Sequence, residues 1–349
     1  MSLTSSPATP SSPSPRARQV SLTLLAAVIV IAAAVSIGGT AAYFELRPHA
    51  PGGTEVVDDL GRAVSVPTDP HRIVVLAPSV MDIVYRLGLR SSVVAVGCDA
   101  AETGGIDNEY SPNQTALWGL SNSSCVPDFP SLDTGDVALL GPQLVLASTI
   151  TSALAVDQLQ ATYGIPVVVF APSSVEGIIG DVRIMAQIFP EAANVATPLE
   201  AKLADTLANA SAWDANFSTN NVSIPTVLLS YYFDPGGYYT YGPGSFGDSL
   251  IALAGGDNIA SSVPLLYAEL NASVALVDQP QIILYGTSND SYLVSGETPS
   301  VWPSAPYWSE LDGTKIAVDV TWVTEADPTM ILFVPVLMHW LHPTIVPAP

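Results

Sequence analysis

The chain has 349 residues, which is enough for two domains of ordinary size. It carries 10 basic and 32 acidic side chains, and this net charge of -22 repels phosphate backbones and excludes nucleic-acid binding. The acidic residues are too few to coat a halophilic protein. Lysine and arginine are scarcer still, as suits a protein exposed to an acidic exterior, where each extra basic side chain adds repulsive positive charge.

The N-terminal region predicts a membrane span. Residues 1–19 are mainly Ser, Pro and Thr, so they cannot bury a core, and we expect a disordered cytosolic tail. Residues 20–44 contain no charge and are long enough to cross a bilayer as one helix. Arg16 and Arg18 precede this stretch and Glu45 follows it. The positive-inside rule therefore predicts a single-pass protein of the cell membrane with an extracytoplasmic main domain.

A cleaved signal peptide is the alternative interpretation of the same stretch. The small residues at 38–42 resemble a cleavage site, but the apolar run is longer than the core of a usual signal peptide. Both interpretations export the domain, to which residues 45–53 form a linker.

Two further features depend on export. Cys98 and Cys125 are the only cysteines, and outside the cell they are expected to form a disulfide, whereas in a reducing compartment they would be buried thiols. Sequons of the Asn-x-Ser/Thr type indicate a glycosylated surface. They start at Asn113, Asn122, Asn209, Asn216, Asn221, Asn271 and Asn289.

From residue 54 onwards, short apolar runs alternate with helical stretches. Continuous runs of Val, Ile and Leu are typical of parallel strands that are covered on both faces. An N-terminal lobe is predicted over residues 54–171, with strands at 72–77, 92–96, 143–147 and 166–170.

The same order recurs in a C-terminal lobe over residues 206–349. Here the pattern predicts strands at 225–230 and 281–285 and a helix at 245–254 that ends in two glycines. The segments around Pro142 and Pro280 are counterparts in the two halves.

One amphipathic helix is predicted between the lobes. Apolar residues recur at helical spacing over residues 173–189, within a connecting region at 172–205. Two lobes joined in this way enclose a cleft, and clefts between domains are where small ligands bind.

Eight short motifs occur in a fixed order along the two lobes. They lie at residues 59–67, 70–74, 78–88, 131–133, 142–145, 241–246, 253–260 and 341–343. Through them, residues 54–344 resemble the class of periplasmic binding proteins that deliver vitamin B12, iron-siderophores and haem. The resemblance implies an α/β fold with two Rossmann-like lobes joined by a single long helix, preceded here by the N-terminal transmembrane helix. It also implies a monomer that is not an enzyme and whose partners are an ABC permease and its ATPase.

The chain departs from this family at the expected docking residues. The resemblance implies a glutamate on each lobe that contacts arginines of the permease, but the matching positions hold Gly135 and Ser273. Asp133, Asp136 and Glu269 lie close by and are the candidates to replace these glutamates, since electrostatic steering tolerates a shifted carboxylate.

Aromatic side chains are the candidates for ligand contacts, because flat rings suit a macrocycle or a bulky chelate. The resemblance assigns Tyr239 to the ligand. The other candidates, for each of which ordinary packing is the alternative, are Tyr110, Trp118, Tyr241, Trp302 and Trp308.

The scarcity of lysine and arginine narrows the class of expected ligand. Anionic catecholates usually need several arginines, so a cobalamin-type corrinoid or a near-neutral Fe(III)-siderophore is the expected ligand. A haem-binding protein of the same class and a surface glycoprotein or adhesin are the alternatives.

Catalytic and metal sites are not predicted. The four histidines do not form a metal set, and no nucleophile elbow, zinc-protease motif or P-loop occurs. Residues 242–247 match a dinucleotide-binding pattern, but they lack its βαβ context and its acidic residue. We therefore expect no enzyme activity and no intrinsic cofactor.

Overall fold

The computed structural model describes residues 53–97, 125–128, 131–287, 302–319 and 321–349. The predicted span at 20–44 lies outside these residues. Within the described part of the chain, no helix is long and apolar enough to cross a membrane.

The first lobe is built on a five-stranded parallel sheet. Its strand order is β5-β4-β3-β6-β7. The strands are β3 (Ile73–Val75), β4 (Val93–Gly97), β5 (Cys125–Val126), β6 (Leu144–Ser148) and β7 (Val167–Phe170), and the helices α2 (Pro78–Arg86), α4 (Thr134–Leu139) and α5 (Ala153–Thr162). Val74, Val145 and Val168 are fully buried, as the continuous apolar runs predict for strands covered on both faces.

A small antiparallel hairpin precedes this sheet and is fastened to it. It joins β1 (Thr54–Val57) to β2 (Ala63–Val66). The carboxylate of Asp58 accepts from the Arg62 side chain within the hairpin and from the backbone N–H of Val169 in β7. Gly61 takes a positive φ of 72° in the turn, which explains the glycine of the first motif.

The second lobe has a six-stranded mixed sheet. Its order is β11-β9-β8-β12-β13, and β10 pairs with β8. The strands are β8 (Thr226–Phe233), β9 (Gly237–Tyr241), β10 (Asp257–Asn258), β11 (Tyr267–Asn271), β12 (Ile282–Thr287) and β13 (Thr314–Asp319), and the helices α8 (Phe246–Leu253), α9 (Ala272–Asp278), α11 (Thr321–Thr324) and α12 (Pro328–Leu341). Strands β8, β12 and β13 are parallel, whereas β9 runs antiparallel to both β8 and β11. The second lobe therefore only partly repeats the first.

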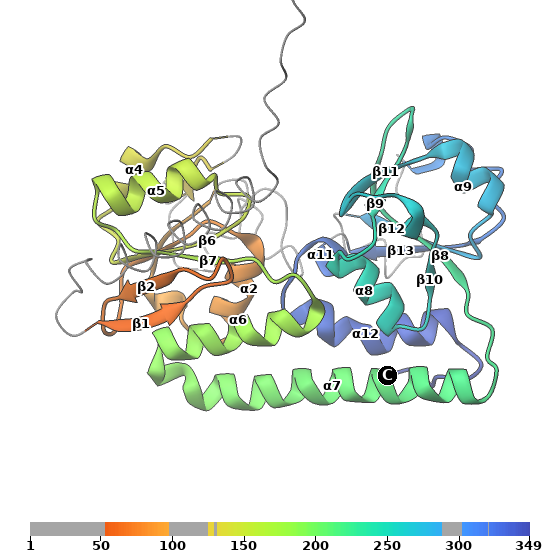
Figure 1. The fold of residues 1–349 in the computed structure, drawn as a ribbon, viewed down its shortest axis with the longest axis horizontal. Helices are drawn as coiled ribbons and strands as arrows, with labels where there is room; N and C mark the ends of the chain where they lie inside the picture. The colour runs from red at the N-terminus through yellow and green to blue at the C-terminus, as the bar shows by residue number, and fades with distance from the viewer. Residues whose placement is uncertain (1–52, 98–124, 129–130, 288–301, 320) are drawn as a thin grey trace, which may run out of the picture. The chain divides into compact units, whose positions relative to one another are not determined.

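Two helices connect the lobes, where the sequence predicted one. The first, α6 (Val175–Ile188), confirms the amphipathic helix expected at 173–189, and Ser174 caps it. A short 3-10 turn leads into α7 (Ala193–Thr219), which continues past the predicted limit at residue 205. Figure 1 shows α7 running beneath both lobes, with α6 and α12 packed along it.

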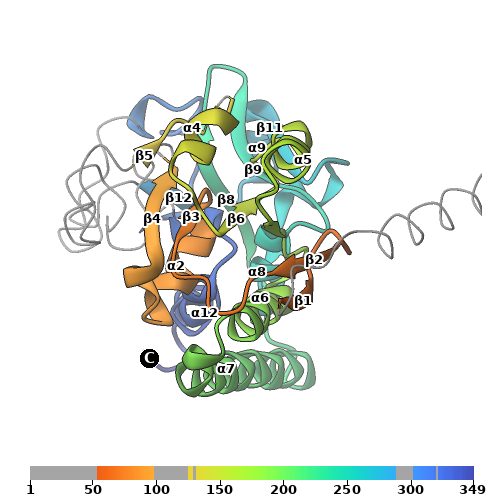
Figure 2. The same cartoon turned by 90° about the vertical axis from the view of Figure 1, so that its left-hand side faces the viewer.

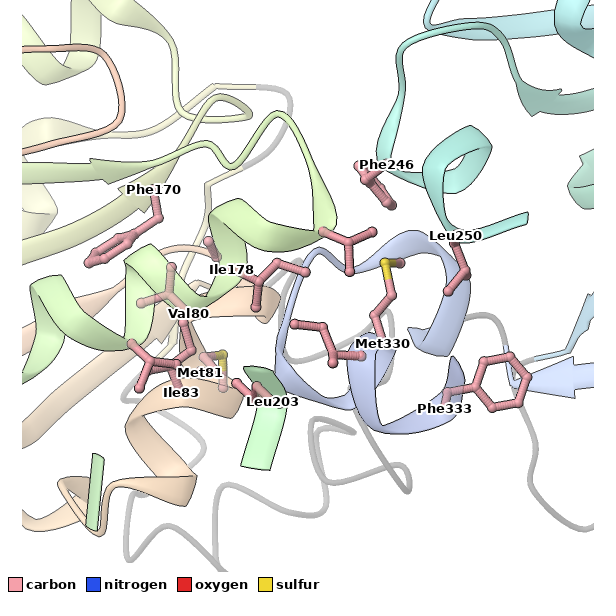
Figure 3. Packing of buried hydrophobic residues seen from close by; sticks show 14 of the residues in the cluster. Val80, Met81, Ile83, Phe170, Ile178, Leu203, Phe246, Leu250, Met330 and Phe333 are labelled. Atoms are coloured by element: carbon pink, nitrogen blue, oxygen red, sulfur yellow. The ribbon is translucent and has the colours of Figure 1, made fainter. Parts of the chain in front are cut away.

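One hydrophobic core passes through both lobes and these helices. In Figure 3, Met81 from α2 and Ile178 from α6 pack near Leu203 of α7, while Leu250 of α8 lies near Met330 of α12. A core shared in this way makes bending between the lobes costly, because interiors are close-packed and resist small displacements.

Candidate ligand-binding surface

A β-bulge allows two consecutive tyrosines of β8, Tyr231 and Tyr232, both to contact tyrosine rings of the neighbouring strand β9. Residues in a regular strand alternate between faces, but the pairing of β8 with β9 shifts between Ser230 and Tyr232. The Ser230 hydroxyl lies 2.9 and 3.0 Å from the carbonyl oxygens of Tyr232 and Tyr239, and its single proton is shared between these two acceptors at the bulge. The Tyr231 ring consequently lies 5.2 Å from Tyr241, and the Tyr232 ring lies 5.3 Å from Tyr239.

Strand β11 and helix α8 extend this group of rings. Tyr267 lies 5.9 Å from Tyr241 and 6.4 Å from Phe246, measured between ring centroids. Tyr241 and Phe246 are buried beneath, while Tyr232 and Tyr267 are 58% and 59% exposed. We call Tyr231, Tyr232, Tyr239, Tyr241 and Tyr267 the tyrosine cluster.

Glycines allow the backbone to approach the tyrosine cluster closely. A Cβ at Gly242 would lie 1.8 Å from the carbonyl oxygen of Leu265. A Cβ at Gly247, in the first turn of α8, would lie 2.3 Å from Cγ of Tyr241. The motif at 241–246 therefore supports the tyrosine cluster, and the glycine pattern at 242–247 has a packing role in place of a nucleotide-binding one.

Glu325 brings a carboxyl group from the end of α11 to the same region. Its side chain accepts a hydrogen bond from the backbone N–H of Ser79 in α2, and it lies near enough to Tyr241 and Tyr267 to raise their pKa. Burial raises the pKa of Glu325 to about 7. This group therefore links the first lobe to the tyrosine cluster and titrates near neutrality. Sequence reasoning missed it, because only the fold brings residue 325 beside residue 79.

The pKa of four phenol groups in the tyrosine cluster is raised, so these four stay protonated at neutral pH. Burial raises the pKa of Tyr231, Tyr241 and Tyr267, and the neighbouring Asp234 carboxylate raises the pKa of Tyr239. These groups can donate hydrogen bonds, and those at the surface present flat rings.

The structure divides the predicted ligand residues into three groups. Tyr239 and Tyr241 belong to the tyrosine cluster, in which Tyr239 is half-buried and Tyr241 has only 1% of its surface exposed. Trp302 and Trp308 are 3% and 8% exposed and pack in the core of the second lobe, where the Trp302 indole donates to Gly286 O. That core placement corresponds to the packing alternative for these two tryptophans. Tyr110 and Trp118 lie outside the described residues.

The docking candidates occupy exposed positions on both lobes. Asp133 caps α4 and accepts from the N–H groups of Gly135 and Asp136, at 2.8 and 3.2 Å. Asp136 lies in the first turn of α4, and Glu269 lies on β11 opposite Tyr239. The Asp133 carboxylate is thus partly occupied by its own helix.

The features that depend on export are only partly within the described residues. Cys125 begins β5, but Cys98 lies outside them, so the disulfide stays a prediction. Asn113, Asn122 and Asn289 also lie outside. Asn209, Asn216, Asn221 and Asn271 are exposed, as glycosylation requires.

The chain matches known proteins along most of its length. The family model described as periplasmic binding protein matches residues 73–298. A cobalamin-binding protein of Halobacterium salinarum is 29% identical over 238 residues, which are 67% of this chain but only 58% of that protein.

Solved structures share the fold at lower identity. The haem-binding protein RhuT from Roseiflexus sp. RS-1, in apo form, has a TM-score of 0.58 and 22% identity, covering 78% of this chain and 98% of RhuT. The vitamin B12-binding protein BtuF of Vibrio cholerae has a TM-score of 0.57 and 19% identity, covering 79% of this chain and 98% of BtuF. As its motifs predict, the chain belongs to the periplasmic binding protein family.

Proposed function

We propose that this protein binds a cobalamin-type corrinoid outside the cytoplasmic membrane and delivers it to an ABC importer. Residues 20–44 would anchor it to the membrane. Membership of the family supports the coarser part of this function, a periplasmic solute-binding protein of an ABC importer. The relatives named above are binding proteins, and the proposal includes no catalysis.

The tyrosine cluster is the observation that carries the corrinoid proposal. A corrinoid offers a broad ring with apolar edges and amide side chains, which suits aromatic surface together with neutral hydrogen-bond donors. Strands β8, β9 and β11 contain no Lys or Arg, so this surface offers no cation to an anionic ligand. The cobalamin-binding relative from Halobacterium salinarum supports the same ligand class.

Apart from Lys202, which is exposed on α7, the described cations are engaged elsewhere in the fold. Lys315 lies over the Trp308 ring and donates to Leu311 O. The five arginines of the described residues likewise have partners: Arg62 with Asp58, Arg72 with the carbonyls of Leu140 and Gly141, Arg86 with Asp82, Arg90 over Tyr85, and Arg183 with Glu200. A catecholate chelate would need unpaired guanidinium groups, which argues for a near-neutral ligand.

Haem is a weaker candidate for the same surface. Haem carries anionic propionate groups, which usually pair with basic side chains. The strands that carry the tyrosine cluster contain no Lys or Arg. A hydroxamate siderophore, which is near neutral, is the alternative that the ligand test must include.

Binding measurements on residues 50–349, which form one compact unit, test the proposal. Tryptophan fluorescence is followed while cyanocobalamin, cobinamide, ferrichrome, a catecholate chelate and haem are added. We expect the corrinoids to bind, and the double variant Tyr232→Ala/Tyr267→Ala to weaken them about tenfold, since each ring contributes roughly 0.5–1.5 kcal/mol. Tyr163→Ala, an exposed tyrosine at the end of α5, is the matched control.

Each other outcome of this titration has a definite meaning. Preferential binding of ferrichrome or haem would replace the corrinoid by that ligand. Binding that is insensitive to Tyr232 and Tyr267 would remove the tyrosine cluster as the site. If none of the ligands binds, the surface glycoprotein or adhesin becomes the better assignment.

A further inference from the structure

Two segments of the chain, one in each lobe, contain the same structural features in the same order. Helix α4 in the first lobe and helix α9 in the second are each capped by the side chain before them, Asp133 and Asn271. Each helix is followed by a residue in the left-handed region, Gly141 with φ 59° and Gln279 with φ 44°. Each segment then continues through a Pro-Gln pair into a strand, β6 or β12.

Within these segments, one equivalent pair of aliphatic side chains points into solvent. Leu139 is 86% exposed and Val277 is 81% exposed, the two highest values among the large hydrophobic residues of the described chain. Each residue lies two positions before the left-handed residue, in the last turn of its helix. The buried partners of the two helices, Val137 and Ala275, are also equivalent, so the exposure repeats because the helices sit on their lobes in the same way.

Both helices lie at the same end of the molecule. Figures 1 and 2 place α4 and α9 at the end opposite α7. The positions of the glutamates expected from the family, Gly135 and Ser273, are in the first turns of these helices. The exposed aliphatic pair thus occupies the surface where docking carboxylates were expected.

Exposed acidic groups lie on the same or neighbouring elements as this pair in both lobes. Asp136 is exposed on α4, and Asp278 and Glu269 are exposed on and beside α9. The sequence contains no Lys or Arg between residues 91 and 182 or between residues 203 and 314. Two copies of this chain would repel each other at this face, and an anionic membrane surface would repel it as well.

We propose that Leu139 and Val277 are paired apolar anchors that dock a two-fold symmetric permease with two equivalent apolar sockets rimmed by basic groups. A surface that repeats once in each lobe fits a partner that presents the same socket twice. Exposed aliphatic residues near acidic groups match the usual anatomy of an interface, in which apolar anchors carry affinity and charges steer the encounter. This inference rests on the proposed function, because it requires an ABC importer as the partner.

The test uses the full-length chain co-reconstituted with its permease and ATPase in liposomes. Stimulation of ATP hydrolysis is measured for the parent, for Leu139→Asp/Val277→Asp, and for the conservative variant Leu139→Met/Val277→Ile. The matched control is Val195→Asp/Ile224→Asp, which changes two half-exposed aliphatic residues on and just after α7, away from α4 and α9. We expect the first variant to lose at least nine tenths of the stimulation, and the conservative variant and the control to stay within about twofold of the parent.

Salt dependence separates apolar anchors from carboxylate docking. Stimulation by the parent should change less than about threefold between roughly 50 and 500 mM NaCl, because contacts between apolar groups are not screened. Full activity of the Leu139→Asp/Val277→Asp variant would overturn the inference. The inference would also be overturned if the parent self-associated or bound liposomes without the importer and the Leu139→Asp/Val277→Asp variant abolished that binding.

Cobalamin binding by the same variants keeps the two proposals apart. If stimulation of the importer depends on Leu139 and Val277 as expected but the parent binds no corrinoid, only the proposed ligand is refuted. A parent that binds cobalamin while stimulation ignores Leu139 and Val277 would refute only the docking inference.

Discussion

Gln143 and Gln281 hold the start of the first strand in the main sheet of their respective lobes in the same way. The side-chain oxygen of Gln143 accepts from the backbone N–H groups of His71 and Arg72, at 2.8 and 3.1 Å, just before β3. The side-chain oxygen of Gln281 accepts from the backbone N–H of Thr226, at 3.0 Å, where β8 begins. The glutamine of the Pro-Gln pair is therefore a structural clamp, repeated at equivalent positions of the two lobes.

Removing either clamp should weaken the fold modestly. We expect Gln143→Ala and Gln281→Ala each to lower the free energy of unfolding by about 1 kcal/mol, because one partly exposed hydrogen-bond acceptor is lost. The double variant should lose about 2 kcal/mol, since the two sites lie in different lobes and share no partner. Urea unfolding measures these values.

The exposed Gln158 on α5 provides the control for these two substitutions. Gln158→Ala should change the free energy of unfolding by less than about 0.5 kcal/mol. If it destabilises as much as Gln143→Ala, the loss reflects a general effect of removing glutamine and not the clamp.

Much of the first lobe was predictable because its signals are local. The runs around Val74, Val145 and Val168 are continuous and apolar, and they form buried parallel strands as expected. The helix at 173–189 was equally clear, because its apolar residues recur with the helical period and Ser174 supplies a cap.

The second lobe and the second connecting helix were less predictable. Strand β9 reverses direction after the turn at 234–236, in which Asp234 accepts from the N–H of Gly236. The bulge at Ser230, and with it the grouping of Tyr231 and Tyr232, depends on pairing with a strand that no local pattern specifies. Adjacent aromatic residues within one strand were the only available hint. Helix α7 buries few residues for its length, so its periodicity is weak.

Gly247 provides a test of how the tyrosine cluster is supported. Gly247→Ala places a methyl group against the Tyr241 ring, so it should lower the free energy of unfolding by about 1–3 kcal/mol through overpacking and should weaken corrinoid binding. Gly180→Ala is the matched control, because a Cβ at this position in α6 meets no atom within 4 Å. The control should instead stabilise the protein by roughly 0.5–1 kcal/mol, as alanine favours a helix. Equal melting temperatures for the two variants would contradict this account of the motif.

An ion pair on α2 fastens the first lobe to α12 in the second. Asp82 is buried, and Arg86 reaches both its carboxylate, at 2.8 Å, and the hydroxyl of Thr329, at 2.5 Å. Arg86→Met would leave the Asp82 carboxylate buried beside Asp327. Burial and the neighbouring Asp82 already raise the pKa of Asp327. We expect a loss of about 3–5 kcal/mol in the free energy of unfolding.

Two companion variants show whether this loss comes from the unpaired carboxylate. Asp82→Leu/Arg86→Met should recover most of the stability, since an apolar pair can replace a buried ion pair. Arg183→Met removes the half-exposed pair with Glu200 and should cost less than about 1 kcal/mol. A double variant no better than Arg86→Met alone would mean that the charge of Asp82 is not the cause.

Asp181 makes the stability of the connecting helices depend on pH. It is 1% exposed on α6, its Oδ1 atom has no hydrogen-bond partner, and burial together with the neighbouring Asp59 raises its pKa from 3.8 to about 9. The folded protein therefore binds a proton more tightly than the unfolded chain does. Such a group contributes its full stabilisation below the unfolded pKa near 4 and loses it as the pH rises toward 9.

The substitution Asp181→Asn keeps the shape of this side chain and removes its titration. The parent should lose stability between pH 5 and pH 9, by several kcal/mol as an upper bound, because one pKa unit corresponds to about 1.4 kcal/mol. The variant should lose much less stability over this range. A smaller dependence on pH should remain, because burial also raises the pKa of Glu325 and of Asp327. Urea unfolding at each pH gives these slopes, and Asp157→Asn, on the exposed side of α5, should retain the parent's slope. An Asp181→Asn variant as sensitive to alkaline pH as the parent would show that Asp181 is ionised in the native protein at neutral pH.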